Sequence, residues 1–211
     1  MKRFWAIFTV LAAVVMLAFS SCKETKEFDD HANWQKRNSE FIESIAIKCD
    51  LNSQQYSEIS SIPEGTPFRL LSFKLDPNKT FGNGSYVYCE IITKGTGSVS
   101  PQYTDSVRIN YRVRLIPTDY YPEGQVVDQS FKTQSLDPSV NIPASFAVRG
   151  VIEGVTTALM HMHCGDYWRL YIPSDLAYGS NDNGIIPAYS TLIFEINLTE
   201  LARTGKDLSP R

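Results

Sequence analysis

The stretch from Phe146 to Leu201 constrains the fold of this chain most strongly, because helix and strand periodicities follow one another closely within it. From about Val151 onward, apolar residues recur at the spacing that gives a helix one apolar face. These residues are Ile152, Val155, Leu159 and Met162. Residues 166–173 and 192–198 alternate apolar with polar side chains instead, as half-buried strands do. One helix among alternating strands predicts an α+β fold.

The clearest strand of the chain spans residues 106–117. Its apolar face carries Val107, Ile109, Tyr111, Val113 and Leu115. Its polar face carries Arg108, Asn110, Arg112 and Arg114. This alternation predicts an antiparallel strand with one face in the core and one in water. Three arginines would also suit an anion site, but we expect an ordinary solvated sheet face.

A further amphipathic helix is predicted within residues 31–48, where Trp34, Phe41 and Ile45 are set among polar residues. The segment is short, so we expect it to fold back on its own domain and not to serve as a dimerisation arm. Two apolar runs follow, at 68–75 and 86–92. The second is a strand after an Asn-Gly turn. The first is either an added strand or a loop packed on the core.

Composition places the chain among ordinary globular proteins. It has 211 residues, of which 43% are hydrophobic and 20% charged, and its formal net charge is -3. This length suits one good-sized domain with an extension, or two small domains. The weak negative charge argues against recruitment by nucleic acid or by an anionic membrane surface.

The first 22 residues form a targeting segment. Lys2 and Arg3 precede an apolar run from Phe4 to Phe19, and Ser20-Ser21-Cys22 provides a small-residue cleavage site. This ending resembles a bacterial lipobox. The resemblance implies a signal peptide over residues 1–21, cleavage before Cys22 and lipid attachment to its sulfur, which would tether the protein to a membrane. An ordinary secretory signal and an uncleaved anchor are the alternatives.

Three cysteines remain beyond the lipobox, namely Cys49, Cys89 and Cys164. An odd number cannot all pair within the chain, although an export compartment would permit one disulfide. Cys89 lies in a strand pattern and equally suits a small buried hydrophobe. We favour a fold without a structural disulfide.

Motifs for covalent and metal chemistry are missing from the sequence. It contains no nucleophile elbow, phosphate-binding loop or paired-cysteine metal motif. The cluster from His161 to Cys164 lies where the predicted helix runs into a glycine turn, without a fourth ligand nearby in sequence. We therefore expect neither a metal nor a cofactor.

Four ordered blocks resemble the FKBP-type peptidyl-prolyl isomerases. They are Gly150–Gly154, Met162–Gly165, Ile172–Gly179 and Gly184–Leu198. The resemblance implies an antiparallel sheet half-wrapped around one short helix over residues 86–203. Residues 22–85 would form a tether and an N-terminal helical extension, and 204–211 a C-terminal tail.

The resemblance also implies an activity, the cis–trans isomerisation of X-Pro bonds, which requires no covalent chemistry. The barrier to rotation about a peptide bond is ~18–20 kcal/mol. An apolar pocket that removes the amide from water destabilises its planar, polar ground state more than the twisted state. Aromatic walls and one or two hydrogen-bond donors meet this need.

Site residues follow from matching the family pattern to this sequence. Tyr178 would donate its hydroxyl to the substrate carbonyl, and Tyr111 with Asp128 would form a polar corner near the twisting amide; these three are the expected catalytic residues. Ile152 would offer its backbone N–H. The expected substrate-binding residues are Val127, Val151, Ile152, Val155, Ile186 and Phe194.

Three departures from the family pattern weaken the expectation of catalysis. Val155 replaces a usual Trp, Val127 a usual Phe, and Ala144 another common aromatic wall. The loop between Tyr178 and Ile185 is also slightly short. Two hypotheses stay open: a lipid-anchored, monomeric envelope isomerase acting on proline-containing exported polypeptides, or a non-catalytic lipoprotein that uses the same fold as a peptide-binding or assembly scaffold.

Overall fold

The computed structural model describes residues 29–52, 56, 58–137 and 140–209. The expected signal peptide and Cys22 lie outside these residues. Contacts divide the chain into Met1–Asp30 and His31–Arg211, and the fold given below is that of the second unit. Within the described part of the chain, no helix is long and apolar enough to cross a membrane.

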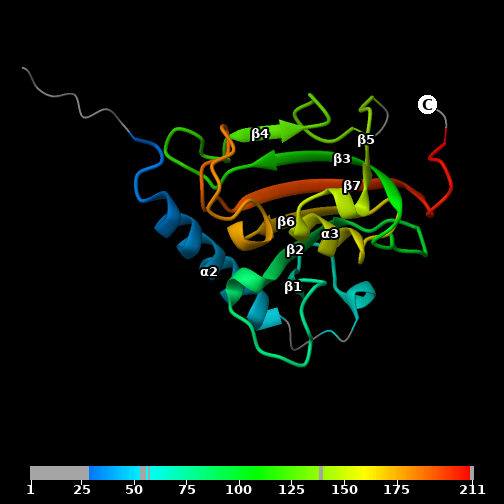
Figure 1. Cartoon of the computed structure of the whole chain (residues 1–211), viewed down its shortest axis with the longest axis horizontal. Coiled ribbons are helices and arrows are strands. Elements are labelled where there is room, and N and C mark those ends of the chain that lie inside the picture. Colours follow the sequence, from blue (N-terminus) through cyan, green and yellow to red (C-terminus); the bar gives the residue numbers. More distant parts are fainter. Residues whose placement is uncertain (1–28, 53–55, 57, 138–139, 210–211) are drawn as a thin grey trace, which may run out of the picture. The chain divides into compact units, whose positions relative to one another are not determined.

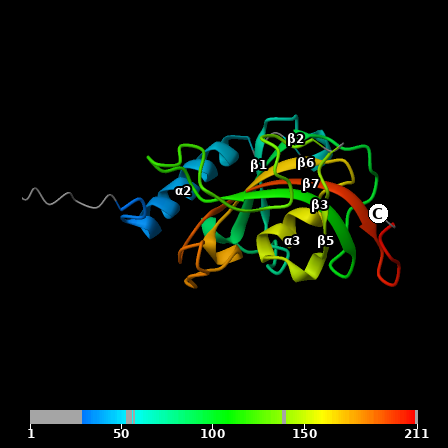
Figure 2. The same ribbon diagram turned by 90° about the horizontal axis from the view of Figure 1, so that it is seen from above.

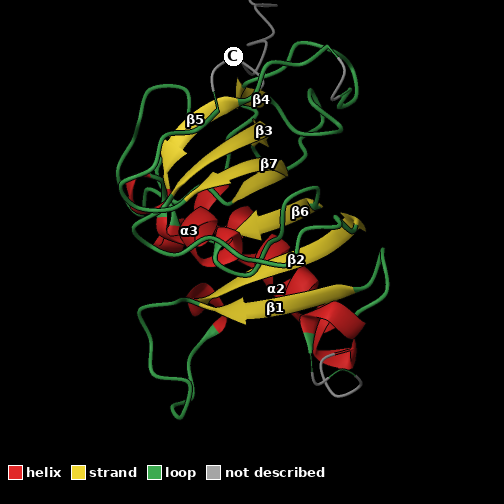
Figure 3. Ribbon diagram, turned by 90° about the vertical axis from the view of Figure 1, so that its right-hand side faces the viewer, coloured by secondary structure: helices red, strands yellow, loops and turns green. Residues whose placement is uncertain are grey.

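Seven strands form one antiparallel sheet (Figures 1 and 3). They are β1 (Pro67–Leu71), β2 (Tyr86–Thr93), β3 (Ser106–Arg114), β4 (Val126–Gln129), β5 (Ala144–Ala147), β6 (Tyr167–Ile172) and β7 (Leu192–Ala202). Their order in the sheet is β1-β2-β6-β7-β3-β4, and β5 pairs with β3 beside β4. The neighbouring strands β7 and β3 are the longest in the sheet, and they carry the longest apolar alternations in the sequence.

One face of the sheet packs against the short helix α3 (Glu153–Leu159), as Figure 2 shows. The predicted helix thus begins two residues later than Val151, and Val155, Leu159 and Met162 are buried as expected. Gly154 allows close contact here, because a Cβ at this position would lie 2.4 Å from Ile172 Cγ2. This arrangement confirms the predicted α+β fold.

The N-terminal helix α2 (Trp34–Asn52) lies against the opposite face of the sheet. Its residues Ile42, Ile45 and Cys49 form a buried cluster with Tyr88, whereas the next strand residue, Cys89, belongs to the core on the α3 side. The helix therefore folds back onto its own unit, as we expected from its length. It extends four residues beyond the predicted end at Lys48.

The first of the two apolar runs, at residues 68–75, overlaps strand β1 and is therefore an added strand of the sheet and not a loop. It pairs with β2, placing Phe68 opposite Cys89, and so joins the sheet at its edge. Four 3-10 turns complete the described elements: η1 (Ile59–Ser61), η2 (Asn83–Ser85), η3 (Val148–Gly150) and η4 (Ser174–Leu176).

The expectation of a solvated polar face on β3 was wrong for its middle residues. Asn110 and Arg112 are buried, at 1% and 5% exposure. The segment after β4 covers this face, because the Arg112 guanidinium donates to the carbonyls of Thr133 and Gln134 and lies 4.4 Å from the Phe131 ring centroid. Arginine at this position serves packing within the chain and does not form an open anion site.

The three described cysteines carry free thiols. Cys49 and Cys89 are buried, and Cys164 is half-buried. Burial raises the pKa of the Cys49 thiol to about 12 and that of Cys89 well above its usual value. Both thiols are therefore protonated at neutral pH and behave as small buried hydrophobes.

Candidate functional site

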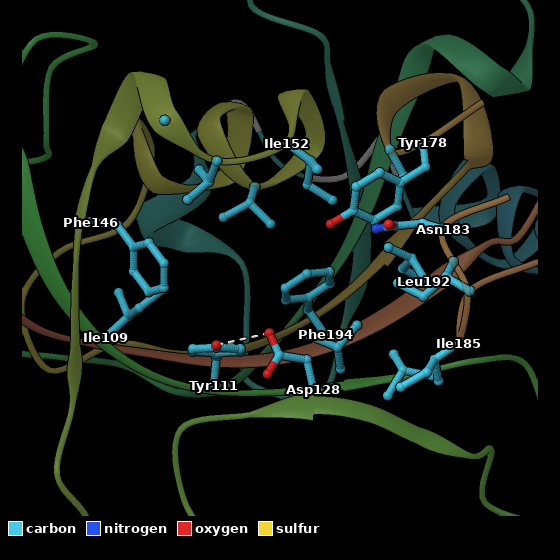
Figure 4. A pocket seen from close by; sticks show the side chains of 17 residues that line it. Ile109, Tyr111, Asp128, Phe146, Ile152, Tyr178, Asn183, Ile185, Leu192 and Phe194 are labelled. Atoms are coloured by element: carbon cyan, nitrogen blue, oxygen red, sulfur yellow. Dashed lines mark hydrogen bonds between the residues drawn. The ribbon is translucent and has the colours of Figure 1, made fainter. Parts of the chain in front are cut away.

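A cavity of about 640 Å³ lies where β3, β4, β5 and β7 meet the start of α3 and the loop before β7 (Figure 4). All nine residues that the sequence assigned to a pocket line it: Tyr111, Val127, Asp128, Val151, Ile152, Val155, Tyr178, Ile186 and Phe194. They come from segments far apart in the chain. The fold thus brings the whole expected set together at one place.

Tyr111 and Asp128 form the polar corner of the cavity. The Tyr111 hydroxyl donates a hydrogen bond of 2.9 Å to Asp128 Oδ2. The backbones of β3 and β4 are held in register beside it, since Ser130 N–H donates to the Tyr111 carbonyl at 2.9 Å. Burial, with the hydrogen bond to Asp128, raises the pKa of Tyr111 to about 12. The phenol is therefore neutral, and its proton is directed at the carboxylate.

Tyr178 reaches into the cavity from the loop after η4, with its hydroxyl toward the centre (Figure 4). Gly179 follows it with φ +62, a conformation that favours glycine, and its N–H donates to the Ser174 carbonyl at 2.8 Å. Tyr178 is 37% exposed, and its hydroxyl has no hydrogen-bond partner among the described residues. This hydroxyl is free to donate to a ligand.

Ile152 stands at the entry to α3. Its φ of -59 and ψ of 151 turn the chain into the helix, and its carbonyl accepts a hydrogen bond from Thr156 N–H at 3.0 Å. Its own N–H has no partner within the described part of the chain, as expected at a helix start. Residue 152 thus provides an apolar side chain to the cavity and a free backbone donor.

Eight further lining residues were not predicted: Ile109, Val113, Phe146, Gly150, Ala177, Asn183, Ile185 and Leu192. Period-two alternation could have found Ile109 and Val113 from Tyr111, and Leu192 from Phe194. The sequence offered no comparable signal for Asn183, which lies in the loop before β7.

The aromatic wall on β5 is Phe146 and not the residue at position 144. Ala144 does not line the cavity, whereas the Phe146 ring packs edge to face on Tyr111 with centroids 5.7 Å apart. Residues 144 and 146 share one face of this short strand, and of the two only Phe146 lines the cavity. Phe146 is thus an aromatic side chain of a cavity that lacks aromatic residues at positions 127, 144 and 155.

The chemical character of the cavity is mainly apolar, with the hydroxyl of Tyr178, the amide of Asn183 and the Tyr111–Asp128 pair as its polar side-chain groups. Among the described residues, no group of three or more His, Cys, Asp or Glu side chains could hold a metal ion. Val155, buried at 2% exposure, lines the cavity and leaves it wider than an aromatic side chain would. Such a site suits an uncharged, partly apolar ligand.

Comparisons with known proteins give matches to one family of isomerases. The family model for the FKBP-type peptidyl-prolyl cis-trans isomerase matches residues 97–199. The chain is 40% identical over 112 residues to the FKBP-type 22 kDa peptidyl-prolyl cis-trans isomerase of Escherichia coli (strain K12), covering 53% of this chain and 48% of that protein. It is 31% identical over 187 residues to the isomerase FkpA of Aeromonas hydrophila, covering 88% and 62%.

Two further relatives extend the comparison. The chain is 36% identical over 117 residues to the outer membrane protein MIP of Legionella longbeachae, covering 55% of this chain and 44% of that one. A crystal structure of a peptidyl-prolyl cis-trans isomerase from Pseudomonas syringae shares 34% identity, covers 56% of this chain and 76% of that one, and has a TM-score of 0.45. The chain spans about half the length of the curated relatives it matches.

Proposed function

Because this chain belongs to the FKBP-type peptidyl-prolyl cis-trans isomerase family, we propose that it catalyses the cis–trans isomerisation of X-Pro bonds in polypeptides. The observation that carries this proposal is one apolar cavity in which two hydrogen-bond donors, the Tyr178 hydroxyl and the Ile152 N–H, lack partners among the described residues. A twisting prolyl amide needs an apolar enclosure and a few donors, and this cavity offers both.

The chemistry follows from the electronic structure of the amide. A planar X-Pro amide is stabilised by resonance and by water at its carbonyl oxygen. An apolar cavity removes that water, and rotation about the C–N bond then costs less, because the twisted amide carries less charge on oxygen. No bond is made or broken, so the reaction requires neither a metal nor a cofactor.

The roles proposed for the polar residues follow their positions. Tyr178 donates its hydroxyl to the carbonyl of the substrate, and Ile152 N–H binds a second carbonyl along the peptide. Tyr111 and Asp128 line the side of the cavity on which the amide rotates. The apolar contacts to the prolyl ring come from Val127, Val151, Val155, Ile186 and Phe194, together with Phe146.

A second candidate function is a non-catalytic peptide-binding scaffold, and Val155 and Val127 favour it. Each replaces an aromatic side chain that would bury ~150–250 Å². The cavity that remains is wider and withdraws an amide less completely from water. Such a site would still bind proline-containing segments.

The test is the rate of cis–trans exchange in short X-Pro peptides, measured by NMR exchange spectroscopy with the full chain in detergent micelles. The uncatalysed reaction takes tens to hundreds of seconds, so acceleration is easily seen. We expect catalysis of at least some peptides in a panel that varies the residue before proline. Exchange at the uncatalysed rate throughout the panel would exclude the isomerase function. If peptide binding is intact in that case, the scaffold function remains.

The proposed location is the cell envelope, with the protein anchored by lipid on Cys22. The lipobox-like ending at residues 19–22 supports this, and one relative is named an outer membrane protein. Polypeptides exported across the membrane would be the substrates. A Cys22→Ser variant should lose the mass of the lipid and move from the membrane to the soluble fraction; membrane retention would contradict the anchor.

The proposed organisation is a monomer with an isomerase domain over residues 86–203, an extension over 22–85 and a tail over 204–211. The support for a monomer is that Ile42, Ile45 and Cys49 of α2 are buried against their own sheet. These side chains are therefore not exposed for pairing with a second helix. Sedimentation equilibrium of the full chain in density-matched detergent should give the monomer mass.

A further inference from the structure

The first turn of α2 lies behind the wall of the cavity. Trp34 packs in one buried cluster with Ile186 and Leu192, and both of these residues line the cavity. No residue of α2 itself lines it. Figure 1 shows the same relationship, with the orange segment that precedes β7 beside α2. The N-terminal helix thus supports the pocket from outside.

Hydrogen bonds join Trp34 to the turn over residues 187–191. Trp34 Nε1 donates to Ser190 Oγ at 2.8 Å, in a buried position. The Ser190 hydroxyl in turn donates to the Pro187 carbonyl at 2.6 Å, across the same turn. Because Trp34 and Ser190 are 7% and 4% exposed, water cannot readily replace this chain of bonds.

Asn38 makes a second connection one helical turn later. Its Oδ1 accepts a hydrogen bond of 2.7 Å from Thr191 N–H, immediately before β7, and its Nδ2 donates to the Trp34 carbonyl at 2.8 Å. Asn38 is 2% exposed, so an apolar residue here would leave the Thr191 amide buried without a partner. The hydrogen bond to the turn 187–191 therefore explains why a buried position of α2 carries a polar residue, Asn38.

The same turn is tied to the loop that carries Tyr178. Tyr189 has a positive φ of 61, unusual for a non-glycine residue, and its N–H donates to the Gly179 carbonyl at 2.8 Å. A shift of the turn would therefore move both the wall at Ile186 and the backbone next to Tyr178.

We propose that Trp34 and Asn38 are positioning residues, which hold the turn 187–191 so that Ile186, Leu192 and the Tyr178 loop form the binding wall of the cavity. The part of this proposal that concerns catalysis rests on the isomerase function proposed above. The N-terminal extension is then a component of the site, although it lies outside the segment that matches the family model.

The test compares Trp34→Phe with Ile45→Val in the full chain in detergent micelles. Trp34→Phe keeps an aromatic ring and removes the N–H donor. Ile45 is buried on the same helix but packs toward Tyr88, away from the cavity, so Ile45→Val controls for a general loss of stability. The methyl signals of Ile186 and Leu192 in NMR spectra report the surroundings of these two wall residues directly. The values of kcat and KM report how the wall affects turnover and substrate binding.

For Trp34→Phe we expect displaced methyl signals of Ile186 and Leu192 and a rise in KM of about threefold to tenfold, the range of one ordinary hydrogen bond. The change in kcat should be smaller, because apolar walls bind substrate and transition state similarly. For Ile45→Val we expect both signals and KM to stay as in the unchanged chain. If Trp34→Phe does not fold, Ser190→Ala removes the same bond from the other side.

The proposal is overturned if Trp34→Phe leaves the two methyl signals in place, or if Ile45→Val displaces them equally at a matched loss of stability. Failure of the isomerase function has a different signature, namely exchange at the uncatalysed rate in the unchanged chain. In that case the methyl signals and the Kd of a proline peptide decide the positioning role.

Discussion

The Tyr111 hydroxyl donates a 2.9 Å hydrogen bond to Asp128 Oδ2, and this bond connects β3 to β4 beside the cavity. The carboxylate also accepts a hydrogen bond from Gln129 N–H at 2.8 Å through Oδ1, which holds it in place. The two side chains therefore present one polar surface to a ligand. Their contributions to catalysis should depend on each other.

The Tyr111–Asp128 pair should behave as a unit in a double-mutant cycle. Tyr111→Phe and Asp128→Ala should each lower kcat/KM by about threefold to tenfold, as the loss of one hydrogen-bonded contact does. The double variant should be little worse than either single one, because the first change already removes the shared bond. Steady-state isomerisation kinetics measure the cycle; additive losses would show that the residues act independently.

Tyr178→Phe tests the donor that has no partner within the described structure. The change removes one hydroxyl and leaves the ring, so we expect a fall in kcat/KM of about twofold to tenfold with unchanged thermal unfolding. Tyr120→Phe is the matched control, because Tyr120 is 71% exposed and does not line the cavity. Equal activity of the Tyr178 variant and the unchanged chain would remove this residue from the mechanism.

Val155→Trp tests whether the wide cavity limits catalysis. Val155 lines the cavity, and an indole there would add apolar surface where the amide must lose its water. We expect a higher kcat/KM, at a cost in stability of up to about 3 kcal/mol from crowding. Exchange spectroscopy and urea unfolding measure the two effects. A folded variant with unchanged exchange would count against residue 155 as part of the pocket.

Gly154→Ala tests the close contact between α3 and β6. An added Cβ would lie 2.4 Å from Ile172 Cγ2 and 3.1 Å from its Cδ1, so helix and sheet would have to separate. We expect a loss of about 1–3 kcal/mol in the free energy of unfolding, typical of an overpacked core. Gly150→Ala is the control, since its Cβ would meet only Ala147 Cβ at 3.7 Å. Equal stabilities would contradict the packing shown.

Tyr111 should make the stability fall at alkaline pH. Burial and the hydrogen bond to Asp128 raise its pKa to about 12, whereas an unfolded tyrosine titrates near ~10. The unfolded chain thus loses this proton first, and the stabilisation present below pH ~10 is lost as the pH rises toward ~12. Urea unfolding at several pH values measures the slope. Tyr111→Phe should reduce this loss of stability with pH without abolishing it, because burial also raises the pKa of Tyr167 to about 12.

Much of the fold was predictable, because periodicity is a local property of the sequence. The alternations in β3, β6 and β7 and the apolar face of α3 were all identified in advance. Most pocket residues, by contrast, came from resemblance to a family and not from periodicity. The inward position of Phe146 and the burial of Arg112 were missed, since each depends on a segment distant in sequence.

The sequence by itself determined the helices α2 and α3, the strands β2, β3, β6 and β7, and the apolar faces of α3, β3, β6 and β7, because neighbouring side chains decide these properties through backbone spacing. Only the tertiary structure decided that Trp34 and Asn38 of α2 bond to the turn 187–191, and that Ile152 and Tyr178, whose N–H and hydroxyl lack partners among the described residues, line one cavity. Trp34 and Ser190 are 156 positions apart, and no local pattern encodes a contact over that distance. Such contacts arise when the sheet closes and buried polar groups must find partners.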